Sequence, residues 1–388
     1  MPDRNSADFR LAALMGMLAD RHQTFFCPVA QPRQREAIGH EHATRYRRLL
    51  EERGVRIEDA GIAKALRARE YDVVMFEWYF VAKDRLCDAR RRQPQARIVV
   101  DSVDIVYNRL EAKARVTNVP EDVGKARSTK TVELAVYQKA DVVITVTDAD
   151  AALLRCELPQ LATFTIPNIH PLQDPVLISD RARGLLFIGS FAQPGGETNL
   201  DAMFYFCREI LPHVAAAVPD VKLRIVGSSP TPEIVALASP HVEVIGFVPD
   251  IKPYLTTSAI SVAPLRFGGG MKGKIGEAMS FALPVVTTSV GIEGFGLTPG
   301  RDALVADNPA DFARALIHLL RDRAARDQVR MAGYRFISEH YSDVAARNRV
   351  EALFSQLHRY RIKRDSPFRL WRGRAKDMWD RHIGWRLK

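Results

Sequence analysis

Short apolar runs alternate with helical segments along almost the whole chain, and this alternation is the strongest constraint on its fold. In the first half, runs typical of strands occupy residues 24–29, 55–57, 72–76, 97–101, 141–146 and 163–166. In the second half, such runs occupy residues 184–188, 221–226, 242–245, 259–263, 285–288 and 303–305. Strands that alternate with helices form parallel sheets that are covered on both faces. The sequence therefore predicts an α/β protein built from two Rossmann-like, doubly wound parallel-sheet domains.

The helices expected between these runs suggest where the domains begin and end. They occupy residues 7–20, 42–53, 81–92, 119–139, 148–156, 199–217, 231–238, 251–256, 309–321, 324–338 and 344–361. A length of 388 residues suits two domains. We expect an N-terminal domain at 1–166, a proline-containing linker at 167–183, a C-terminal domain at 184–342, a closing helix at 343–361 and a basic tail at 362–388. Because no apolar run precedes the first helix, the first strand of the N-terminal domain is expected to be missing.

One stretch, residues 263–288, combines groups that suit a phosphorylated ligand. It starts at a strand end, where open α/β sheets bind their ligands, so we expect the two domains to face a central cleft there. Gly268–Gly270 would let backbone N–H groups approach an anion, and Lys272 and Lys274 add positive charge. Glu277, one turn into the following helix, could accept hydrogen bonds from ribose hydroxyls. The pattern predicts a pyrophosphate-and-ribose site; the alternative is a glycine-rich turn with solvated lysines.

Positive charge is concentrated at the C-terminus. Residues Arg359–Lys388 hold eleven Lys and Arg against three Asp and Glu, an excess of eight in a chain whose net charge is +10. The rest is nearly balanced, which argues against a nucleic-acid partner. Within Phe368–Lys388, aromatic and apolar residues recur at helical spacing among basic ones. Such a helix suits an anionic membrane surface, and packing against the N-terminal domain is the open alternative.

Cysteine usage and hydropathy indicate the compartment. The four cysteines, Cys27, Cys87, Cys156 and Cys207, are scattered and form no CxxC motif, which suits a reducing cytosol, where we expect buried or half-buried thiols. No apolar run is long enough to span a membrane, and no apolar segment typical of a secretory signal follows Met1. A cytoplasmic protein is therefore expected, with the basic tail as its contact to the inner face of the membrane.

Several motifs, in the right order, resemble the C-terminal domain of family four glycosyltransferases, retaining enzymes of GT-B fold. They are LLFIGSF at 185–191, LRIVGSSP at 223–230, VEVIGFVPDIKPYL at 242–255, the stretch 263–288, TTSVGIEGFGL at 287–297 and GRDALVAD at 300–307. Pieces of the N-terminal half, such as DSVDIVYNR and IPNIHP, are more weakly similar. The resemblance is greatest to the subgroup that builds bacterial surface polysaccharides.

The resemblance implies roles for residues of the donor site. Glu277 matches the carboxylate that holds the ribose. Lys274 is the better match for the basic residue on the diphosphate, and Lys272 is the second, with the N–H of Gly270 sharing that charge. All of these roles are implied by the family pattern. Lys274 and Glu277 are accordingly the expected catalytic residues of this domain.

Further along, Gly291 and Glu293 match a segment that brings N–H groups and a polar side chain to the donor. Two departures from the family pattern change what can be expected. The first glutamate of the usual pair, which touches the transferred sugar, is replaced by Gly269, eight positions before Glu277. The usual Arg and Lys after the first strand of the domain are absent from residues 189–198. Sugar recognition must therefore differ, with the backbone of Gly269 contacting the sugar.

Three residues of the N-terminal half are candidates for the other side of the site. Asp104 follows a strand end and is expected to contact the donor sugar or the acceptor; the alternative is a helix or turn cap. Arg109 is assigned to the acceptor or a phosphate, with a surface salt bridge as the alternative. Arg10, on the first helix, could direct its charge at the diphosphate, but an exposed arginine is the favoured interpretation.

Other motifs are better explained without a metal. Asp148–Asp150 resembles a DxD metal motif but opens a helix, so capping by Asp148 explains it better. The pair of histidines in His40–His42 has no third ligand at useful spacing, which indicates a solvated helix end. His170, at the domain junction, is expected either to line the cleft or to act at a hinge.

These observations predict a metal-independent retaining glycosyltransferase of the hexosyltransferase type. Its substrates would be a nucleoside-diphosphate sugar and a glycan or lipid-linked acceptor of polysaccharide synthesis, and no cofactor is expected. One alternative is a sugar-nucleotide epimerase of the same fold. Another is a non-catalytic, membrane-bound partner of a second glycosyltransferase, which Gly269 favours and which Glu277 and Lys274 argue against.

Overall fold

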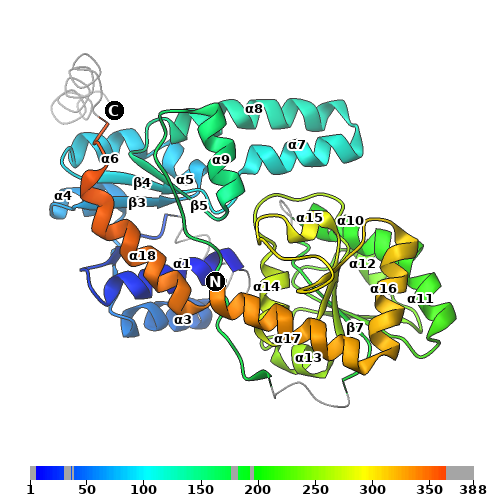
Figure 1. Cartoon of the computed structure of the whole chain (residues 1–388). Helices are drawn as coiled ribbons and strands as arrows, with labels where there is room; N and C mark the ends of the chain where they lie inside the picture. The colour runs from blue at the N-terminus through cyan, green and yellow to red at the C-terminus, as the bar shows by residue number, and fades with distance from the viewer. Residues whose placement is uncertain (1–5, 30–35, 37–38, 176–181, 193–195, 364–388) are drawn as a thin grey trace.

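The computed structural model describes residues 6–29, 36, 39–175, 182–192 and 196–363, so the basic tail beyond Lys363 lies outside the described residues. The chain forms two α/β lobes, each built on a parallel sheet (Figure 1). The prediction of two parallel-sheet domains is therefore confirmed. We refer to the lobe around the four-stranded sheet as the N-terminal domain and to the lobe around the six-stranded sheet as the C-terminal domain.

The N-terminal domain has a four-stranded parallel sheet of order β3-β4-β5-β6. Its strands are β3 (Val73–Glu77), β4 (Arg97–Asp101), β5 (Val142–Thr145) and β6 (Thr163–Thr165). Its helices are α1 (Ser6–Ala19), α3 (His40–Glu52), α4 (Ile62–Ala68), α5 (Tyr79–Lys83), α6 (Leu86–Arg92), α7 (Val106–Thr117), α8 (Pro120–Tyr137) and α9 (Asp148–Glu157). The runs expected at 24–29 and 55–57 contribute only β1 (Phe25–Phe26) and β2 (Arg56–Ile57), which pair with each other in a separate small sheet.

Alternating side chains of β4 bury both faces of the N-terminal sheet. Ile98 and Val100 pack in one cluster, with Leu86, Ala89 and Tyr137 from the helices α6 and α8. Val99 packs in the opposite cluster with α1 and with α18 (Asp343–Gln356). All three strand residues are fully buried. This two-faced burial explains why the strand is a continuous apolar run and not an alternating one.

The C-terminal domain has a six-stranded parallel sheet of order β12-β11-β10-β7-β8-β9. Its strands are β7 (Leu185–Ile188), β8 (Leu223–Val226), β9 (Val242–Gly246), β10 (Ile260–Ala263), β11 (Val285–Thr287) and β12 (Leu304–Val305). Its helices are α10 (Glu197–Tyr205), α11 (Leu211–Ala217), α12 (Pro232–Val235), α13 (Lys252–Thr257), α14 (Gly273–Ser280), α15 (Ser289–Ile292), α16 (Pro309–Arg321) and α17 (Arg323–His340). From the centre of the sheet the strands follow one another outward from β7 to β9 on one side and from β10 to β12 on the other, as in a doubly wound sheet.

The helix expected at 199–217 is not continuous. A π-helical segment, Phe206–Ile210, separates α10 from α11. Pro212 lies in the first turn of α11. Its ring lacks an N–H and clashes with the carbonyl four residues earlier, which disfavours a regular α-helical turn just before it.

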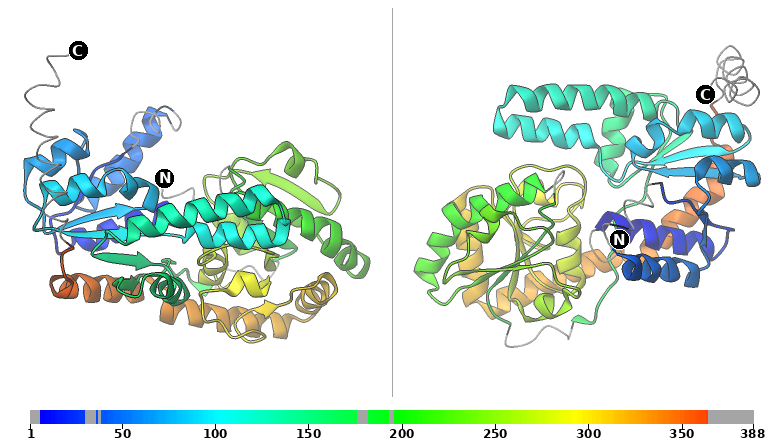
Figure 2. Two further views of the ribbon diagram at one scale, coloured as in Figure 1. Left: turned by 90° about the horizontal axis from the view of Figure 1, so that it is seen from above. Right: turned by 180° about the vertical axis from the view of Figure 1, so that it is seen from behind.

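The last described helix returns to the N-terminal domain. The helices α17 and α18 run along one side of the molecule from the C-terminal to the N-terminal domain, as two views show (Figure 2). Ala346, Val350 and Leu353 of α18 are buried against the N-terminal sheet. The chain therefore crosses between the domains twice, once between β6 and β7 and once between α17 and α18.

Two further expectations about the surface can be assessed. Cys27 and Cys207 are half-buried, but Cys87 and Cys156 are exposed, so the expectation of four buried or half-buried thiols is wrong for these two. Both exposed residues lie on the outer faces of α6 and α9, and cysteine is tolerated there as a small side chain. Among the helices that the structure describes, none combines the length and the apolar character needed to cross a bilayer.

Candidate functional site

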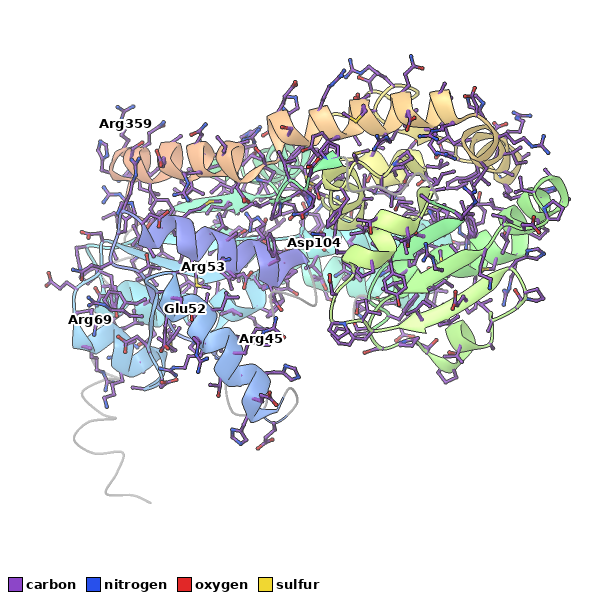
Figure 3. All side chains as sticks on the ribbon, turned by 90° about the horizontal axis from the view of Figure 1, so that it is seen from below. Arg45, Glu52, Arg53, Arg69, Asp104 and Arg359 are labelled. Carbon is purple, nitrogen blue, oxygen red and sulfur yellow. The ribbon has the colours of Figure 1, made fainter. Side chains whose placement is uncertain are left out.

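The site predicted from the sequence lies where the C-terminal domain meets the N-terminal domain. Strand β10 ends at Ala263, and the chain then passes through the glycine loop, residues 264–272, before α14 begins at Gly273. No side chain caps the first turn of α14 within the described part of the chain. Figure 3 shows Asp104, from the loop after β4, at the junction of the two domains. Residues of both domains therefore converge at the glycine loop.

Lys274 is a half-buried cation in the first turn of α14. Its Nζ donates a hydrogen bond to Oδ1 of Asn199 and lies 4.4 Å from the centroid of the Phe187 ring. Burial, followed by the nearby charge of Lys272, lowers the pKa of Lys274 to about 7. Among the described residues no carboxylate pairs with it. No described carboxylate of the protein balances this amine, and the charge of an incoming anion would favour its protonated form.

Lys272 is more deeply buried and is tied to its surroundings. Its Nζ donates to the carbonyl of Gly270 at 2.8 Å and lies 3.4 Å from Oε2 of Glu293. Burial lowers its pKa, and Glu293 and Asp104 oppose that effect. The side chain of Lys272 is 5% exposed, whereas that of Glu293 is 59% exposed. Glu293 therefore covers Lys272 from the solvent side.

Glu277 lies one turn further along α14 and is half-buried. Burial raises the pKa of its carboxyl group to about 7. No hydrogen bond or ion pair holds this carboxyl group within the described part of the chain. A desolvated carboxyl group without a protein partner is costly unless a ligand supplies donors, and ribose hydroxyls could do so.

Asp104 and Arg109 form an ion pair in the N-terminal domain. Nε of Arg109 donates to Oδ2 of Asp104 at 2.8 Å, and the side chains are 26% and 16% exposed. The other oxygen of Asp104, Oδ1, is buried without a hydrogen-bond partner. The suggested capping role of Asp104 is wrong, because α7 begins at Val106 after the N-cap residue Ile105. The salt bridge suggested for Arg109 is therefore present, but it is half-buried and does not lie at the surface.

The free oxygen of Asp104 faces the glycine loop of the opposite domain. A Cβ atom added to Gly269 would lie 2.7 Å from Oδ1 of Asp104 and 2.8 Å from Cβ of Arg109. A Cβ atom on Gly270 would lie 3.3 Å from the same oxygen, and Gly270 has a φ of +58°. Gly269 is therefore needed for space and Gly270 for its backbone conformation. The glycines allow a carboxylate from the N-terminal domain to approach the loop.

Arg10 is fully buried, so the interpretation as an exposed arginine is wrong. Nη1 donates to Oδ2 of Asp101 at 2.6 Å, and Nη2 and Nε donate to the carbonyls of Ile166 and Pro167. The other oxygen of Asp101 accepts from the N–H of Val103. Through Asp101, Arg10 thus fixes the loop that carries Asp104, while its own guanidinium is occupied by these protein groups.

The second donor segment, Gly291 to Glu293, lies in and after the short helix α15. The N–H of Gly291 is occupied by Thr288, whose hydroxyl and carbonyl accept at 3.2 and 3.0 Å. Gly291 also packs closely on Thr287, since a Cβ atom would lie 1.9 Å from its Oγ1. The described contacts of Gly291 are therefore structural, and Glu293 contributes its carboxylate to the site through Lys272.

His170 is buried at the domain junction. A Cβ atom on Gly276 would lie 2.2 Å from its Nε2, so the imidazole packs directly on α14. Nε2 has no hydrogen-bond partner, and burial lowers the pKa of His170 to about 4. The backbone N–H of His170 donates to the carbonyl of Tyr341 at 2.9 Å. His170 therefore packs against α14 as a neutral side chain.

The helix that carries the DxD-like motif is capped by the residue before it. Oγ1 of Thr147 accepts from the N–H of Asp150 at 2.9 Å, and the hydroxyl donates to Oδ2 of Asp150 at 2.8 Å. The prediction that Asp148 is the cap is therefore wrong by one residue, because a threonine hydroxyl satisfies the free N–H equally well. Asp150 is buried, and burial raises its pKa to about 6.

Two residues that contribute to the site were not predicted from the sequence. Asn199 accepts the hydrogen bond from Lys274 and donates to the carbonyl of Ser190 at 2.6 Å. Glu133, on α8, accepts the N–H groups of Val106 and Tyr107 and so caps α7 from outside. The position of Asn199 in the first turn of a helix after β7 was a usable signal. Glu133 lies 27 residues from Val106, and nothing local indicated it.

Together, these groups could bind a diphosphate and a sugar. The lysines and the free first turn of α14 provide positive charge and N–H donors. Glu277 and Asp104 provide carboxylate oxygens that lack protein hydrogen-bond donors among the described residues. These carboxylates come from opposite sides of the domain junction.

Comparisons with known proteins relate the C-terminal domain to a protein family. Residues 182–322 match the family described as Glycosyl transferases group 1. A curated protein of Klebsiella pneumoniae, an uncharacterized 44.6 kDa protein in the cps region, is 25% identical over 191 residues. That match covers 45% of this chain and 47% of the relative, so the chain spans about half the length of the curated protein that it matches.

Solved structures share the fold. Anabaena Alr3699/HepE, crystallised with UDP-glucose, has a TM-score of 0.65 at 16% identity, covering 90% of this chain and 96% of that one. TarM of S. aureus, in complex with UDP among other ligands, has a TM-score of 0.59 at 15% identity, covering 75% and 58%. At these identities the likeness establishes the fold alone, and the fold is GT-B as the sequence predicted. Within the C-terminal domain, residues 182–322 are thus similar to the group 1 glycosyl transferases.

Proposed function

We propose that the protein transfers a sugar from a UDP-sugar to a glycan or lipid-linked acceptor, with retention of configuration and without a metal ion. The observation that carries the proposal is the half-buried Lys274, which has no described carboxylate partner and whose pKa burial lowers to about 7. A diphosphate would supply the missing negative charge. The UDP and UDP-glucose bound in structures of similar fold support uridine as the base.

The chemistry places the largest demand on the leaving group. The bond between the anomeric carbon and the diphosphate breaks, and negative charge develops on the UDP oxygens. Lys272, Lys274 and the first turn of α14 stabilise that charge without reorganisation. The acceptor hydroxyl attacks from the face that UDP leaves, and its proton passes to the departing phosphate, as the family resemblance implies. Glu277 holds the ribose in this arrangement.

Asp104 is assigned to the transferred sugar. Its free Oδ1 faces Gly269 and Gly270 and lies in the electrostatic field of Lys272. We infer that this carboxylate accepts a hydrogen bond from a hydroxyl of the transferred sugar. In the usual family pattern, a glutamate at the position of Gly269 makes this contact. Arg109 orients Asp104, and Arg10 positions its loop. The glycine at 269 therefore gives no support to a non-catalytic role.

The acceptor belongs to polysaccharide synthesis in this proposal. The similar protein from the Klebsiella cps region supports such a pathway. A lipid-linked acceptor would be reached at the inner face of the cytoplasmic membrane, and the basic tail, Phe368–Lys388, has the composition to bind anionic lipid there. The tail lies outside the described residues, so this assignment rests on sequence.

We expect water to take the place of the acceptor slowly, so the proposal can be tested without knowing the acceptor. UDP release from UDP-glucose, UDP-galactose and UDP-N-acetylglucosamine is measured with the full chain in the presence of EDTA. We expect release from at least one donor, and a loss of about 100-fold or more in Lys274→Met. Lys252→Met, the same change on the exposed face of α13, is the matched control. Absence of release from all three donors, or equal rates in both variants, would contradict the proposal.

A further inference from the structure

Asn199, in the first turn of α10, joins Lys274 to the loop after strand β7. Its Oδ1 accepts the hydrogen bond from Nζ of Lys274, and its Nδ2 donates to the carbonyl of Ser190 at 2.6 Å. An ammonium group offers only donors and a carbonyl group only an acceptor, so these two contacts require a side chain that both accepts and donates. An amide meets this requirement without carrying a charge.

The surroundings of Asn199 are shaped to this contact. A Cβ atom added to Gly189 would lie 2.8 Å from both Cγ and Nδ2 of Asn199, so the glycine leaves the space that the amide fills. On the other side, Nζ of Lys274 lies 4.4 Å from the centroid of the Phe187 ring. The face of an aromatic ring attracts a cation without neutralising its charge. Lys274 is therefore held between a neutral amide and a neutral ring.

The carboxylates of α10 are directed at other partners. Glu197 and Asp201 stand two residues before and two residues after Asn199 on this helix. Asp201 pairs with Arg266, and Glu197 lies in the electrostatic field of Arg109 in the opposite domain. The helix therefore presents a neutral side chain to Lys274, although acidic residues lie on both sides of it in the sequence.

Among the described residues, the other groups around Lys274 provide no counter-ion. Burial and then the positive charge of Lys272 lower the pKa of Lys274 to about 7. Residues 189–198 contain no Lys or Arg that could replace it. Lys272 is bonded to the carbonyl of Gly270 and lies 3.4 Å from Oε2 of Glu293. The charge of Lys274 therefore depends on what the site binds.

We propose that Asn199 is a positioning residue for the donor. Its neutral hydrogen bond holds the amine of Lys274 in place and leaves the diphosphate to supply the negative charge that keeps the amine protonated. An aspartate in the same place would supply that charge itself and would repel the diphosphate. The inference rests on the proposed function, because only an anionic donor calls for a lysine that is held in this way.

A purely structural role of Asn199 leads to a different expectation. If the residue served only to tie the loop after β7 to α10, alanine and aspartate would be equally harmful, because both lose the contact with the carbonyl of Ser190. If Asn199 controls the charge of Lys274, aspartate is far more harmful than alanine. The comparison of these two variants therefore separates the roles.

Calorimetry with the full chain makes this comparison. The affinity for UDP is measured at about pH 7.5 for the wild type, Asn199→Ala and Asn199→Asp. We expect Asn199→Ala to bind about threefold more weakly than the wild type, and Asn199→Asp to bind at least about tenfold more weakly than Asn199→Ala. Asn118→Asp, the same change in the exposed turn between α7 and α8, is the control and is expected to bind UDP as the wild type does.

Chemical labelling measures the charge of Lys274 without a donor. Acetic anhydride acetylates a neutral amine and not an ammonium group, so the pH dependence of acetylation at Lys274, followed by mass spectrometry of the full chain after digestion, gives its pKa. We expect half-maximal reactivity near pH 7 in the wild type, at no higher pH in Asn199→Ala, and above about pH 8.5 in Asn199→Asp.

The outcomes separate this inference from the proposed function. Equal affinities for UDP in Asn199→Ala and Asn199→Asp, or acetylation of Lys274 over the same pH range in both, would overturn the inference. UDP binding by Asn199→Ala that is as tight as in the wild type would overturn it too, and this comparison does not require Asn199→Asp to fold. The expected acetylation pattern without UDP binding in the wild type would support the control of Lys274 by Asn199 and contradict the UDP-sugar donor.

Discussion

Oδ1 of Asp104 lies 2.7 Å from the position that a Cβ atom on Gly269 would occupy, although the two residues belong to different domains. A side chain at position 269 and the carboxylate of Asp104 therefore compete for one space. The absence of a glutamate at 269 follows from this competition in our account. The carboxylate of the site comes from the N-terminal domain, and the sugar would lie between the two domains.

Gly269→Ala is expected to impair transfer without abolishing nucleotide binding. The added methyl group must displace the carboxylate of Asp104 and also Cβ of Arg109, which is close to the backbone and moves at greater cost. We expect UDP release from the UDP-sugar to fall about tenfold or more, since a misplacement of about 1 Å is costly to catalysis. UDP affinity, measured by calorimetry, changes less than about twofold.

Gly124→Ala on α8 is the control for this substitution, because nothing lies within 4 Å of its Cβ position. An unchanged rate of UDP release in Gly269→Ala would show that Asp104 does not contact the reacting sugar. Equal losses in both variants would point to a general effect on folding.

Lys274→Met is expected to stabilise the free protein and abolish donor binding. The ammonium is desolvated, and its only described hydrogen-bond partner is the amide oxygen of Asn199. Methionine removes that cost, so we expect the free energy of unfolding to rise by about 1–3 kcal/mol at pH 7. Chemical denaturation and UDP calorimetry measure both effects. A variant that is destabilised, or that still binds UDP as the wild type does, contradicts this role.

Donor affinity is expected to pass through a maximum near pH 7. The pKa of Lys274 is lowered to about 7, so its positive charge is lost as the pH rises above that value. The pKa of Glu277 is raised to about 7, so its carboxylate is lost as the pH falls below that value. UDP-glucose carries a constant charge over this range, which makes it the suitable ligand for calorimetry from pH 6 to 8.5.

Glu277→Gln removes one of these two titrations. We expect this variant to bind UDP-glucose more weakly than the wild type does. Its affinity should decrease steadily with rising pH, about tenfold between pH 7 and 8.5, as Lys274 becomes neutral. An affinity of the wild type that is independent of pH would contradict the assignment of both residues.

His170 is expected to make stability depend on pH below neutrality. Its folded pKa is about 4, against about 6.5 in an unfolded chain, so the unfolded state binds more protons between these values. Its contribution to stability is therefore fully present above pH 6.5 and is lost as the pH falls toward 4, by up to about 3 kcal/mol. We expect the difference in Tm between pH 7 and pH 5 to be smaller in His170→Gln than in the wild type.

The exposed His213 on α11 provides the control for His170. His213→Gln leaves the difference in Tm between the two pH values unchanged in our account. The same reduction in both variants would show that the effect is not due to burial of His170.

Local sequence patterns predicted most of the strands, because buried parallel strands are apolar along their whole length. The strand expected at 97–101 has the bounds of β4. Helix α7 was missed because its first turn is not capped by a neighbouring residue. The carboxylate of Glu133 caps it from α8, which only the tertiary structure brings into place.

The same limit applies to the candidate site. The glycine loop, both lysines and Glu277 are close in sequence, so their grouping could be inferred. The approach of Asp104 to Gly269 depends on how the two domains dock, and they are 165 positions apart in the numbering. Arg10 is buried by its contacts with Asp101 and Ile166, which lie 91 and 156 residues away in the sequence. No periodicity in the sequence records such contacts.

The most direct measurement is a thermal-shift comparison of UDP, GDP, ADP and CMP on the wild type and on Glu277→Ala. A ligand that binds only the folded state raises Tm by an amount that grows with the logarithm of 1 + [L]/Kd. We predict that UDP raises the Tm of the wild type, that the other nucleotides raise it less, and that the UDP effect is lost in Glu277→Ala. If none of the four nucleotides shifts the Tm of a wild type shown to be folded, the donor site at α14 is contradicted.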